Sequence, residues 1–258
     1  MNITKYVCVD WKALVDVIDA LGGLDLDLTK EEVHWVNGYI TETANSIGYP
    51  CDALKGEGRV HLNGVQAVSY SRIRYTSGDD FLRASRQRIV LQAILEKCKG
   101  EDIATLTSMC SSMMDDISTN FTVKEILALA KNVTKYQISS TTGFPYNVAT
   151  KELSGVGDTV IPIDLATDVV QLHKYLFEDE SYTVSDTVQS ISDTVQKKTD
   201  VDSKTDIYDT TKYNNTAGST GTEGAKKKNK DAQDALKKSQ SESENDSTTK
   251  SSSDDSDD

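Results

Sequence analysis

Residues 70–88 read YSRIRYTSGDDFLRASRQR and contain five of the chain's six arginines. Lysine supplies the other 22 of the 28 basic residues, so arginine is concentrated in one short segment. A guanidinium is a rigid fork of N–H donors that matches the oxygens of a phosphate or a carboxylate. The whole chain carries a net charge of −13 and therefore repels polyanions. We expect this segment to form a pocket for one anionic group and not a surface for nucleic acid.

The second half of this segment predicts a helix over residues 81–97, with Asp80 as its N-cap. Within that helix, Arg83, Arg86 and Gln87 are three and four residues apart and are expected to share a face. A helix N-terminus also favours an anion, because its first backbone N–H groups have no partner within the helix. The pocket is therefore expected near the start of this helix.

The first half of the segment supplies a second pair of donors. Arg72 and Arg74 are two residues apart, so an extended backbone would direct both side chains to the same face. Across the turn at residues 77–78 they would meet Arg83 and Gln87, and the two pairs would converge on one anion. The alternative is that these arginines form ordinary surface ion pairs with nearby carboxylates.

Apolar periodicity and turn residues predict helices and strands along the chain to about residue 198. The expected strands are 3–9, 24–28, 60–62, 136–141 and 159–162. The expected helices are one capped by Asp10 and running through residue 21, one starting at Thr29, one capped by Asn63, 103–114, one capped by Thr122, 165–177, and 184–195 with Ser181 or Ser185 as its cap. Loops are expected at 46–58 and 142–158. Trp11 is expected to be a core aromatic, with a functional role as the alternative. Strands alternating with amphipathic helices predict an α/β fold.

The composition changes beyond residue 199. Residues 200–258 are rich in Ser, Thr, Asp and Lys and have few large apolar side chains. Such a segment cannot bury enough apolar surface to offset an ordering entropy of about 1–2 kcal/mol per residue. We expect it to be a disordered acidic and polar tail.

Two motifs give the chain a resemblance to a known family. One is Tyr-x-Arg-x-Arg, an aspartate and Arg-x-x-Arg-Gln-Arg within residues 70–88, preceded by LNGVQA at residues 62–67. The other is VDVIDALGGLDLD at residues 15–27. In this order they resemble the LytR-CpsA-Psr (LCP) family, closely over residues 3–100 and more loosely over residues 101–198.

The resemblance implies a fold and a domain organisation. LCP domains have a mixed central sheet flanked by helices on both sides, an α/β/α arrangement. Residues 1–116 would be the C-terminal portion of an LCP catalytic domain, and residues 117–198 an α/β extension packed on it. Residues 199–258 would be the disordered tail. Because family members begin with a cytoplasmic tail and a transmembrane helix, the sequence is expected to start inside the catalytic domain.

The resemblance also implies an activity. LCP proteins transfer a glycopolymer phosphate, such as teichoic acid or capsule, from a polyprenyl-pyrophosphate carrier to peptidoglycan. Catalysis of such a step is mostly positioning and charge neutralisation. Matched by motif, the expected catalytic residues are Arg72, Arg74 and Asp80, and the expected pyrophosphate ligands are Arg72, Arg74, Arg83, Arg86 and Gln87. Asp80 would orient an arginine or assist the incoming hydroxyl, and its alternative role as an N-cap is compatible with both.

The remaining expectations concern the setting of this activity. The family uses Mg²⁺, whose aspartate ligands are expected in the earlier half of the domain and not in this sequence. The expected location is the envelope of a Gram-positive bacterium, on the outer face of the cytoplasmic membrane, with the missing N-terminal helix as anchor. Peptidoglycan and the polyprenyl-pyrophosphate-linked polymer are the expected partners.

Two questions stay open in the sequence. One is whether the chain is instead a non-catalytic protein that binds polyprenyl phosphate or an envelope polymer, or a regulatory protein of the attenuator type. The other is the state of Cys8, Cys51, Cys98 and Cys110, whose spacing does not fit a zinc site. A disulfide between Cys98 and Cys110 and four free thiols are both compatible with the sequence.

Overall fold

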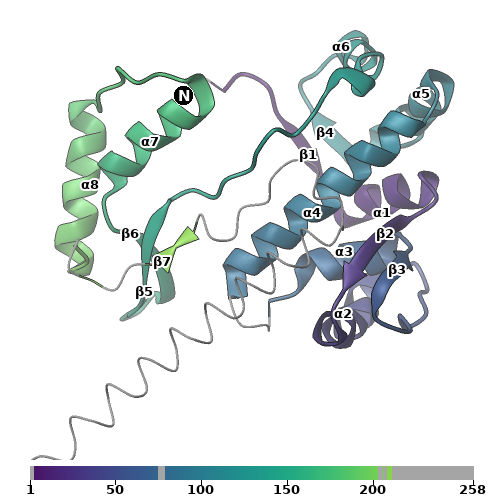
Figure 1. The fold of residues 1–258 in the computed structure, drawn as a ribbon, viewed down its shortest axis with the longest axis horizontal. Helices are drawn as coiled ribbons and strands as arrows, with labels where there is room; N and C mark the ends of the chain where they lie inside the picture. The colour runs from purple at the N-terminus through teal and green to yellow at the C-terminus, as the bar shows by residue number, and fades with distance from the viewer. Residues whose placement is uncertain (1–2, 75–78, 203–204, 206–207, 211–258) are drawn as a thin grey trace, which may run out of the picture. The chain divides into compact units, whose positions relative to one another are not determined.

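The computed structural model describes residues 3–74, 79–202, 205 and 208–210. The described residues divide into two compact units, the first comprising residues 3–141 and the second residues 142–210. The described elements of the first unit are β1 (Val7–Val9), α1 (Trp11–Ala20), β2 (Leu24–Leu28), α2 (Lys30–Ile47), β3 (Gly58–Leu62), α3 (Gly64–Arg72), α4 (Asp79–Gly100), α5 (Ile103–Ser112), η1 (Met114–Asp116), β4 (Ile117–Thr119), α6 (Val123–Ala130) and η2 (Val133–Lys135) (Figure 1).

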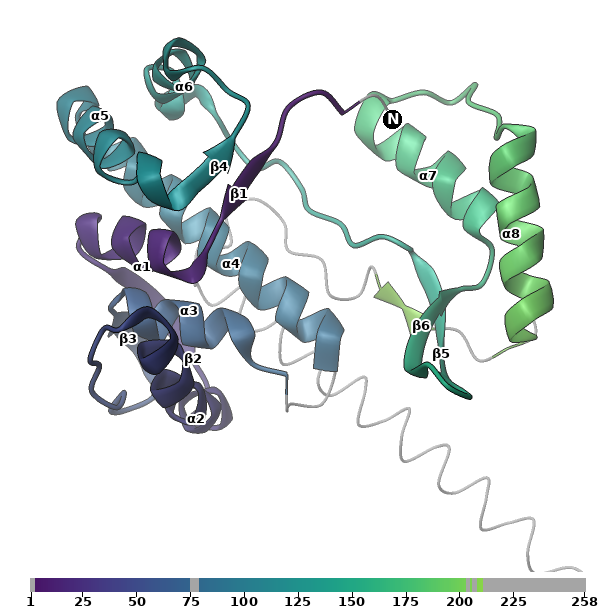
Figure 2. The same cartoon turned by 180° about the vertical axis from the view of Figure 1, so that it is seen from behind.

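Helix α3 is the centre of the first unit. Its residues 64–71 are all buried, and α1, α2 and α4 pack around it (Figures 1 and 2). A helix buried on every side needs no polar face, which explains why α3 lacks the apolar stripe of a surface helix. Beside these helices, β2 pairs antiparallel with β3, from Leu24 opposite Leu62 to Leu28 opposite Gly58. The three leucines of β2 are fully buried, and they alternate with partly exposed aspartates as expected for a strand with one covered face.

The two sequence motifs meet where α1 contacts α3. The backbone N–H of Gly64 donates to Oδ1 of Asp19 over 2.6 Å. A side-chain Cβ at residue 64 would lie 2.4 Å from the carbonyl oxygen of Val15. The contact between these helices therefore requires glycine, and the Asp19 carboxylate satisfies an N–H group that the start of a helix leaves without a partner.

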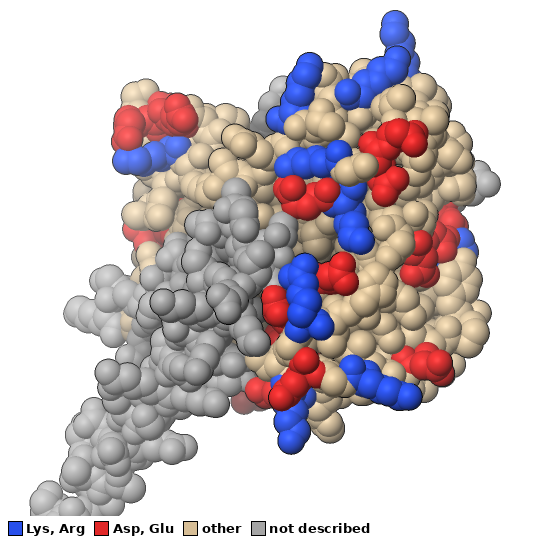
Figure 3. All heavy atoms as spheres, turned by 45° about the vertical axis from the view of Figure 1, so that its right-hand side comes forward, with Lys and Arg blue, Asp and Glu red and all other residues tan. Residues whose placement is uncertain are grey.

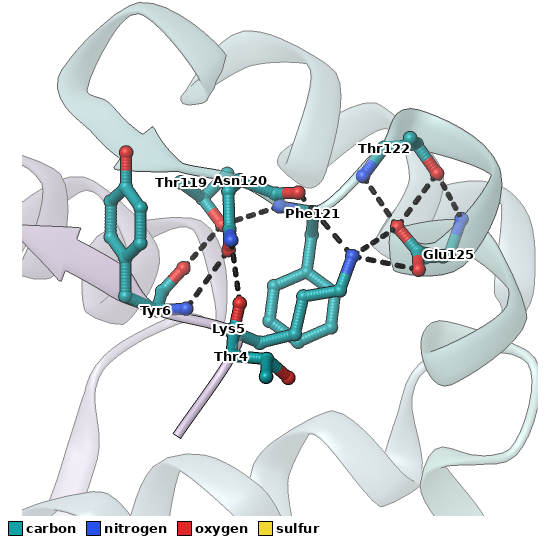
Figure 4. Close-up of polar contacts among 8 residues, drawn as sticks. All are labelled: Thr4, Lys5, Tyr6, Thr119, Asn120, Phe121, Thr122 and Glu125. Atoms are coloured by element: carbon teal, nitrogen blue, oxygen red, sulfur yellow. Dashed lines mark hydrogen bonds and ion pairs between the residues drawn. The ribbon is translucent and has the colours of Figure 1, made fainter. Parts of the chain in front are cut away.

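Residues 4–6 are fastened to the chain after β4 by side-chain hydrogen bonds (Figure 4). Asn120 accepts from the Tyr6 N–H over 3.0 Å and donates to the Thr4 carbonyl over 2.8 Å. Lys5 pairs with Glu125 over 2.8 Å, and its Nζ lies 4.9 Å from the centre of the Phe121 ring. These contacts extend the antiparallel pairing of β1 with β4, whose register sets Val7 opposite Thr119 and Val9 opposite Ile117.

The second unit is a three-stranded antiparallel sheet with two helices. Its elements are β5 (Asn147–Leu153), β6 (Gly157–Pro162), α7 (Leu165–Phe177), α8 (Asp186–Thr199) and β7 (Tyr208–Asp209), in the strand order β6-β5-β7. A small core of buried residues holds it together and consists of Ala149, Ile161, Ile163 and Val201, against which Leu153 and Val195 pack. The structure thus continues past residue 199, where the tail was expected to begin. The rest of that expected tail, residues 211–258, lies outside the described residues.

The α/β class predicted from the sequence is confirmed. In the described part of the chain the strands form three separate antiparallel sheets of two or three strands, and one mixed central sheet is not found there. In these sheets every pair of neighbouring strands is antiparallel. The boundary expected at residues 116 and 117 stays a prediction.

Two predicted segments are wrong. Residues 136–141 are not a strand, and only Ser140 within them makes an isolated bridge. The expected loop at 142–158 contains the seven-residue strand β5. Its glycines form the turn of a hairpin with β6, since Gly155 and Gly157 both have positive φ, at 77° and 94°. Glycine in such a turn is as typical of a hairpin as of a loop.

Candidate functional site

Arg72, the last residue of α3, is held by side chains from α1 and α2. Its Nη1 donates to Oγ1 of Thr43 over 2.7 Å, and its Nη2 donates to Oε1 of Glu42 over 2.8 Å. The guanidinium carbon lies 3.8 Å from the centre of the Trp11 ring and 5.2 Å from that of Tyr39. The side chain keeps 14% of its surface exposed. Arg72 is thus fixed in orientation but still reachable from solvent.

A buried hydroxyl network lies beneath this guanidinium. Thr43 is fully buried, and its Oγ1 accepts from Ser69 on α3 over 3.1 Å as well as from Arg72. The same hydroxyl donates to the carbonyl oxygen of Tyr39 over 2.9 Å. Because both its donor and its acceptor capacity are used, Thr43 has little freedom to turn away from Arg72.

Arg86 occupies a different environment from Arg72. It lies on the buried face of α4 between Leu82 and Ile89, and only 1% of its surface is exposed. Its Nε donates over 3.1 Å to Oε1 of Glu32, which is also buried. Oε2 of Glu32 accepts from the Thr29 backbone and hydroxyl at the start of α2. Arg86 therefore links α4 to the N-terminus of α2, and these contacts favour a structural role over the phosphate contact expected from its motif.

The other predicted site residues lie around the turn between α3 and α4. Arg74 and Gln87 are exposed, and Arg83 is half-buried. The helical face predicted for Arg83, Arg86 and Gln87 is therefore not equally accessible, because Arg86 is buried whereas Gln87 is exposed. Arg74 and Arg83 both take part in polar or charged contacts. Helix α4 begins at Asp79, so Asp80 lies in its first turn and the prediction that Asp80 is the N-cap is wrong. The side chain of Asp80 lies outside the described residues, as does the turn at residues 75–78. The convergence of the two donor pairs stays a prediction.

The sequence missed the side chains that hold Arg72. Trp11 is 40% exposed and contacts Arg72, so its assignment as a core aromatic is wrong. Glu42 and Thr43 carry no motif, because their proximity to Arg72 depends on how α2 packs against α3. One signal was present: Trp11 directly follows the helix cap Asp10 and so lies at the very end of α1, although its spacing from Val15 and Ile18 places it in line with their apolar stripe.

The described residues carry charges of both signs and free thiols, but no metal-binding cluster. On the face shown in Figure 3, basic and acidic side chains are interspersed. Among the described residues no group of three or more His, Cys, Asp or Glu is arranged to hold a metal ion. The four cysteines are free thiols, and burial raises the pKa of Cys98 and of Cys110. None of the described helices is long and apolar enough to cross a membrane.

A protein-family model matches the part of the chain that contains both sequence motifs. The model of the LytR_cpsA_psr family matches residues 1–170. The chain belongs to the LytR_cpsA_psr family. This confirms the resemblance seen in residues 15–27 and 62–88.

Two relatives illustrate the extent of the similarity. TagV of Bacillus subtilis (strain 168), a polyisoprenyl-teichoic acid–peptidoglycan teichoic acid transferase, is 29% identical over 129 residues, which are 49% of this chain and 31% of TagV. TagU of Bacillus mycoides (strain KBAB4), named for the same transfer, is 31% identical over 134 residues, which are 50% of this chain and 38% of TagU. The chain thus matches about a third of the length of these LytR_cpsA_psr relatives.

A solved structure supports the fold alone. The crystal structure of an Enterococcus faecalis protein described as a transcriptional regulator aligns with a TM-score of 0.50 at 15% sequence identity. The alignment covers 77% of this chain and 67% of that protein.

Proposed function

We propose that this LytR_cpsA_psr chain contributes the pyrophosphate-holding part of a cell-envelope phosphotransferase. The enzyme would transfer a glycopolymer phosphate from a polyprenyl-pyrophosphate carrier to peptidoglycan, on the outer face of the cytoplasmic membrane. The teichoic acid transfer named for TagV and TagU supports this class of reaction. The observation that carries the proposal is Arg72, which the buried helix α3 presents with a fixed but solvent-reachable guanidinium.

The reaction places clear demands on such a site. An acceptor hydroxyl oxygen forms a bond to the phosphorus that carries the glycopolymer. The bond from that phosphorus to the bridging oxygen of the pyrophosphate breaks, and polyprenyl phosphate leaves with that oxygen. Charge builds up on the leaving phosphate, and arginine forks stabilise it because they match its oxygens. We assign this task to Arg72, Arg74 and Arg83, with Gln87 as a neutral donor.

The hydroxyl proton needs an acceptor, and the motif assigns it to Asp80. Arg86 is left out of the ligand set because Glu32 already engages it inside the core. The described residues offer no cluster that would hold the Mg²⁺ expected for the family, and no step is assigned to the ion here.

Binding of farnesyl pyrophosphate, a short polyprenyl pyrophosphate, tests the proposal. A charge-assisted hydrogen bond contributes about 1.5–3 kcal/mol, so Arg72→Ala, Arg74→Ala and Arg83→Ala should each weaken binding about ten- to hundredfold. Lysine at these positions should restore only part of the affinity, since a point charge cannot form the forked contact. Calorimetric titration measures the affinities.

Arg59→Ala is the matched control, because Arg59 lies outside residues 70–88 and pairs with Asp27 at the surface over 3.5 Å. If all three site variants fold and bind like the wild type, the arginines are structural and the proposal is wrong. Binding without transfer to peptidoglycan, measured in a protein that also contains the earlier half of the catalytic domain, would instead support the non-catalytic alternative.

A further inference from the structure

The contact between Trp11 and Arg72 is the feature that the proposed function does not yet use. The indole is the first residue of α1, and its ring centre lies 3.8 Å from the guanidinium carbon. Tyr39 of α2 lies 5.2 Å away. A tryptophan with 40% of its surface exposed gains less from burial than a core residue, so its position beside a cation calls for another explanation.

Trp11 is also open to a ligand. With Val9, Asp10, Lys12, Ser46 and Ile47 it borders a surface hollow of about 410 Å³, which has one acidic and one basic side chain in its lining. The indole therefore contacts Arg72 and also borders space that a substrate group can enter.

Stacking on an indole constrains a guanidinium in a way that hydrogen bonds alone do not. The cation is planar, and a ring at van der Waals distance keeps its plane from rotating while the N–H groups at its edge stay able to donate. Thr43 and Glu42 each accept one of these N–H groups. Since a guanidinium has five N–H donors, these two bonds are compatible with an additional anion at the same fork.

We propose that Trp11 is a positioning residue for Arg72, and that its ring holds the guanidinium in the plane in which it receives a pyrophosphate oxygen. The proposal rests on the proposed function, because it assigns to Trp11 a role in the same site. A cation over an aromatic ring contributes from about 0.5 to 2 kcal/mol, so loss of the ring should weaken pyrophosphate binding about three- to thirtyfold.

The test compares Trp11→Leu, Trp11→Phe and Trp35→Leu in the full 258-residue chain. Trp35, the chain's other tryptophan, lies on α2 and contacts the His34 ring at 5.3 Å, so its replacement is a matched control. One readout is the affinity for farnesyl pyrophosphate. The other is the NMR signal of the Arg72 Nε–H group, which the indole ring current shifts and which Arg72→Lys identifies. Thermal unfolding confirms that each variant is folded.

We expect Trp11→Leu to weaken binding and move the Arg72 signal, Trp11→Phe to preserve much of both, and Trp35→Leu to change neither. An unmoved Arg72 signal in Trp11→Leu overturns the proposal, and so does a moved signal with unchanged affinity. If Trp11→Leu does not fold, Trp11→Phe decides, since a smaller ring should still shift the signal by an intermediate amount. If the wild type does not bind the probe, the proposed pyrophosphate site fails and the role of Trp11 falls with it.

Discussion

Glu42 occupies one edge of the Arg72 guanidinium, and its negative charge would repel a phosphate that binds to the other N–H donors. Its carboxylate lies 2.8 Å from Nη2, but 62% of the Glu42 side chain is exposed, so it can move away at small cost. An exposed ion pair of this kind contributes little to stability, with a median of about 0–1 kcal/mol. Glu42 thus competes with the substrate for Arg72 more than it stabilises the fold.

We expect Glu42→Gln to tighten binding of farnesyl pyrophosphate by about three- to tenfold, because it removes the competing negative charge and keeps the side-chain shape. The gain should shrink at high salt, which screens charges between exposed groups. Titration calorimetry at two salt concentrations measures both effects. Glu31→Gln, at an exposed position on the same helix, is the control and should leave the affinity unchanged. Weaker binding by Glu42→Gln would mean that Glu42 orients Arg72 for the ligand.

Gly64 limits how closely α1 and α3 approach. A Cβ at this residue would lie 2.4 Å from the Val15 carbonyl oxygen and 2.8 Å from the Val15 Cα, both backbone atoms that cannot move aside without shifting the helix. Gly64→Ala should lower the free energy of unfolding by about 1–3 kcal/mol or more, as overpacking of a core does. Urea unfolding measures the change.

The control for Gly64 is Gly38→Ala on α2, where a Cβ would meet nothing within 4 Å. That substitution should raise the free energy of unfolding by about 0.5–1 kcal/mol, because alanine is the better helix former. Opposite signs for the two glycines support the packing explanation. Equal effects would contradict it.

Helices α2 and α4 are joined by the buried pair of Glu32 and Arg86. Replacing Arg86 by Met should lower the free energy of unfolding by about 3–5 kcal/mol, because it leaves Glu32 as an uncompensated charge in the core. Glu32→Gln should also be destabilising, because it leaves the Arg86 guanidinium as an uncompensated charge in the core. The double variant should be more stable than the sum of the two changes predicts, since no charge is then buried alone. Urea unfolding of all four proteins gives the coupling energy, and simple additivity would show that the two side chains do not interact.

The sequence predicted the starts of helices well because a cap joins residues only two or three apart. Asp10, Thr29, Asn63, Thr122 and Ser185 each accept a backbone N–H in the first turn of a helix, as expected. Strand partners were harder to predict, because they depend on segments that the local pattern does not specify. Strand β5 shows this, since its pairing with β6 and β7 makes a strand of residues that read as a loop.

The candidate site shows the same contrast between local features, which the sequence predicts, and contacts between distant segments, which it does not. Its arginines were visible as a cluster in the sequence, and the helical period of α4 sets Leu82 and Ile89 on the face that is buried in the core. The same period could not tell that Arg86 would lie with them, because that depends on Glu32 coming from another helix. The contacts of Arg72 with Trp11 and Thr43 likewise arise only after α1 and α2 pack on α3.

For the molecule as a whole, stability is expected to depend on pH through the second unit. Asp168 in the first turn of α7 is 2% exposed, and burial raises its pKa to about 6. Backbone N–H groups of Tyr146 and Asn147 offset part of this effect, and the nearby charge of Asp164 adds to it. The charged form is thus disfavoured in the folded state relative to the unfolded chain, where an aspartate titrates near pH 4.

An acid with a raised pKa stabilises the fold while it is protonated and loses this contribution as the pH rises through about 4–6. We expect the second unit to be about 1 kcal/mol less stable at pH 7.5 than at pH 5, from the difference between these two pKa values. Asp168→Asn should abolish the difference, whereas Asp158→Asn at the exposed position 158 of β6 should keep it. Hydrogen exchange of α7, corrected for the intrinsic rate at each pH, measures the stability. A second unit that is equally stable at both pH values would contradict the assignment.

The bonds that tie residues 4–6 to residues 119–125 also set an order of events during synthesis. The bonds of Asn120 to Thr4 and Tyr6 span 116 and 114 residues of chain, and closing so long a loop costs about 4 kcal/mol of chain entropy. Strand β1 leaves the ribosome among the first residues described here, but β4 follows only after the helices α1 to α5 have been made. The α3-centred core can therefore form before β1 pairs with β4, and the edge of β1 that β4 later covers favours aggregation in that interval.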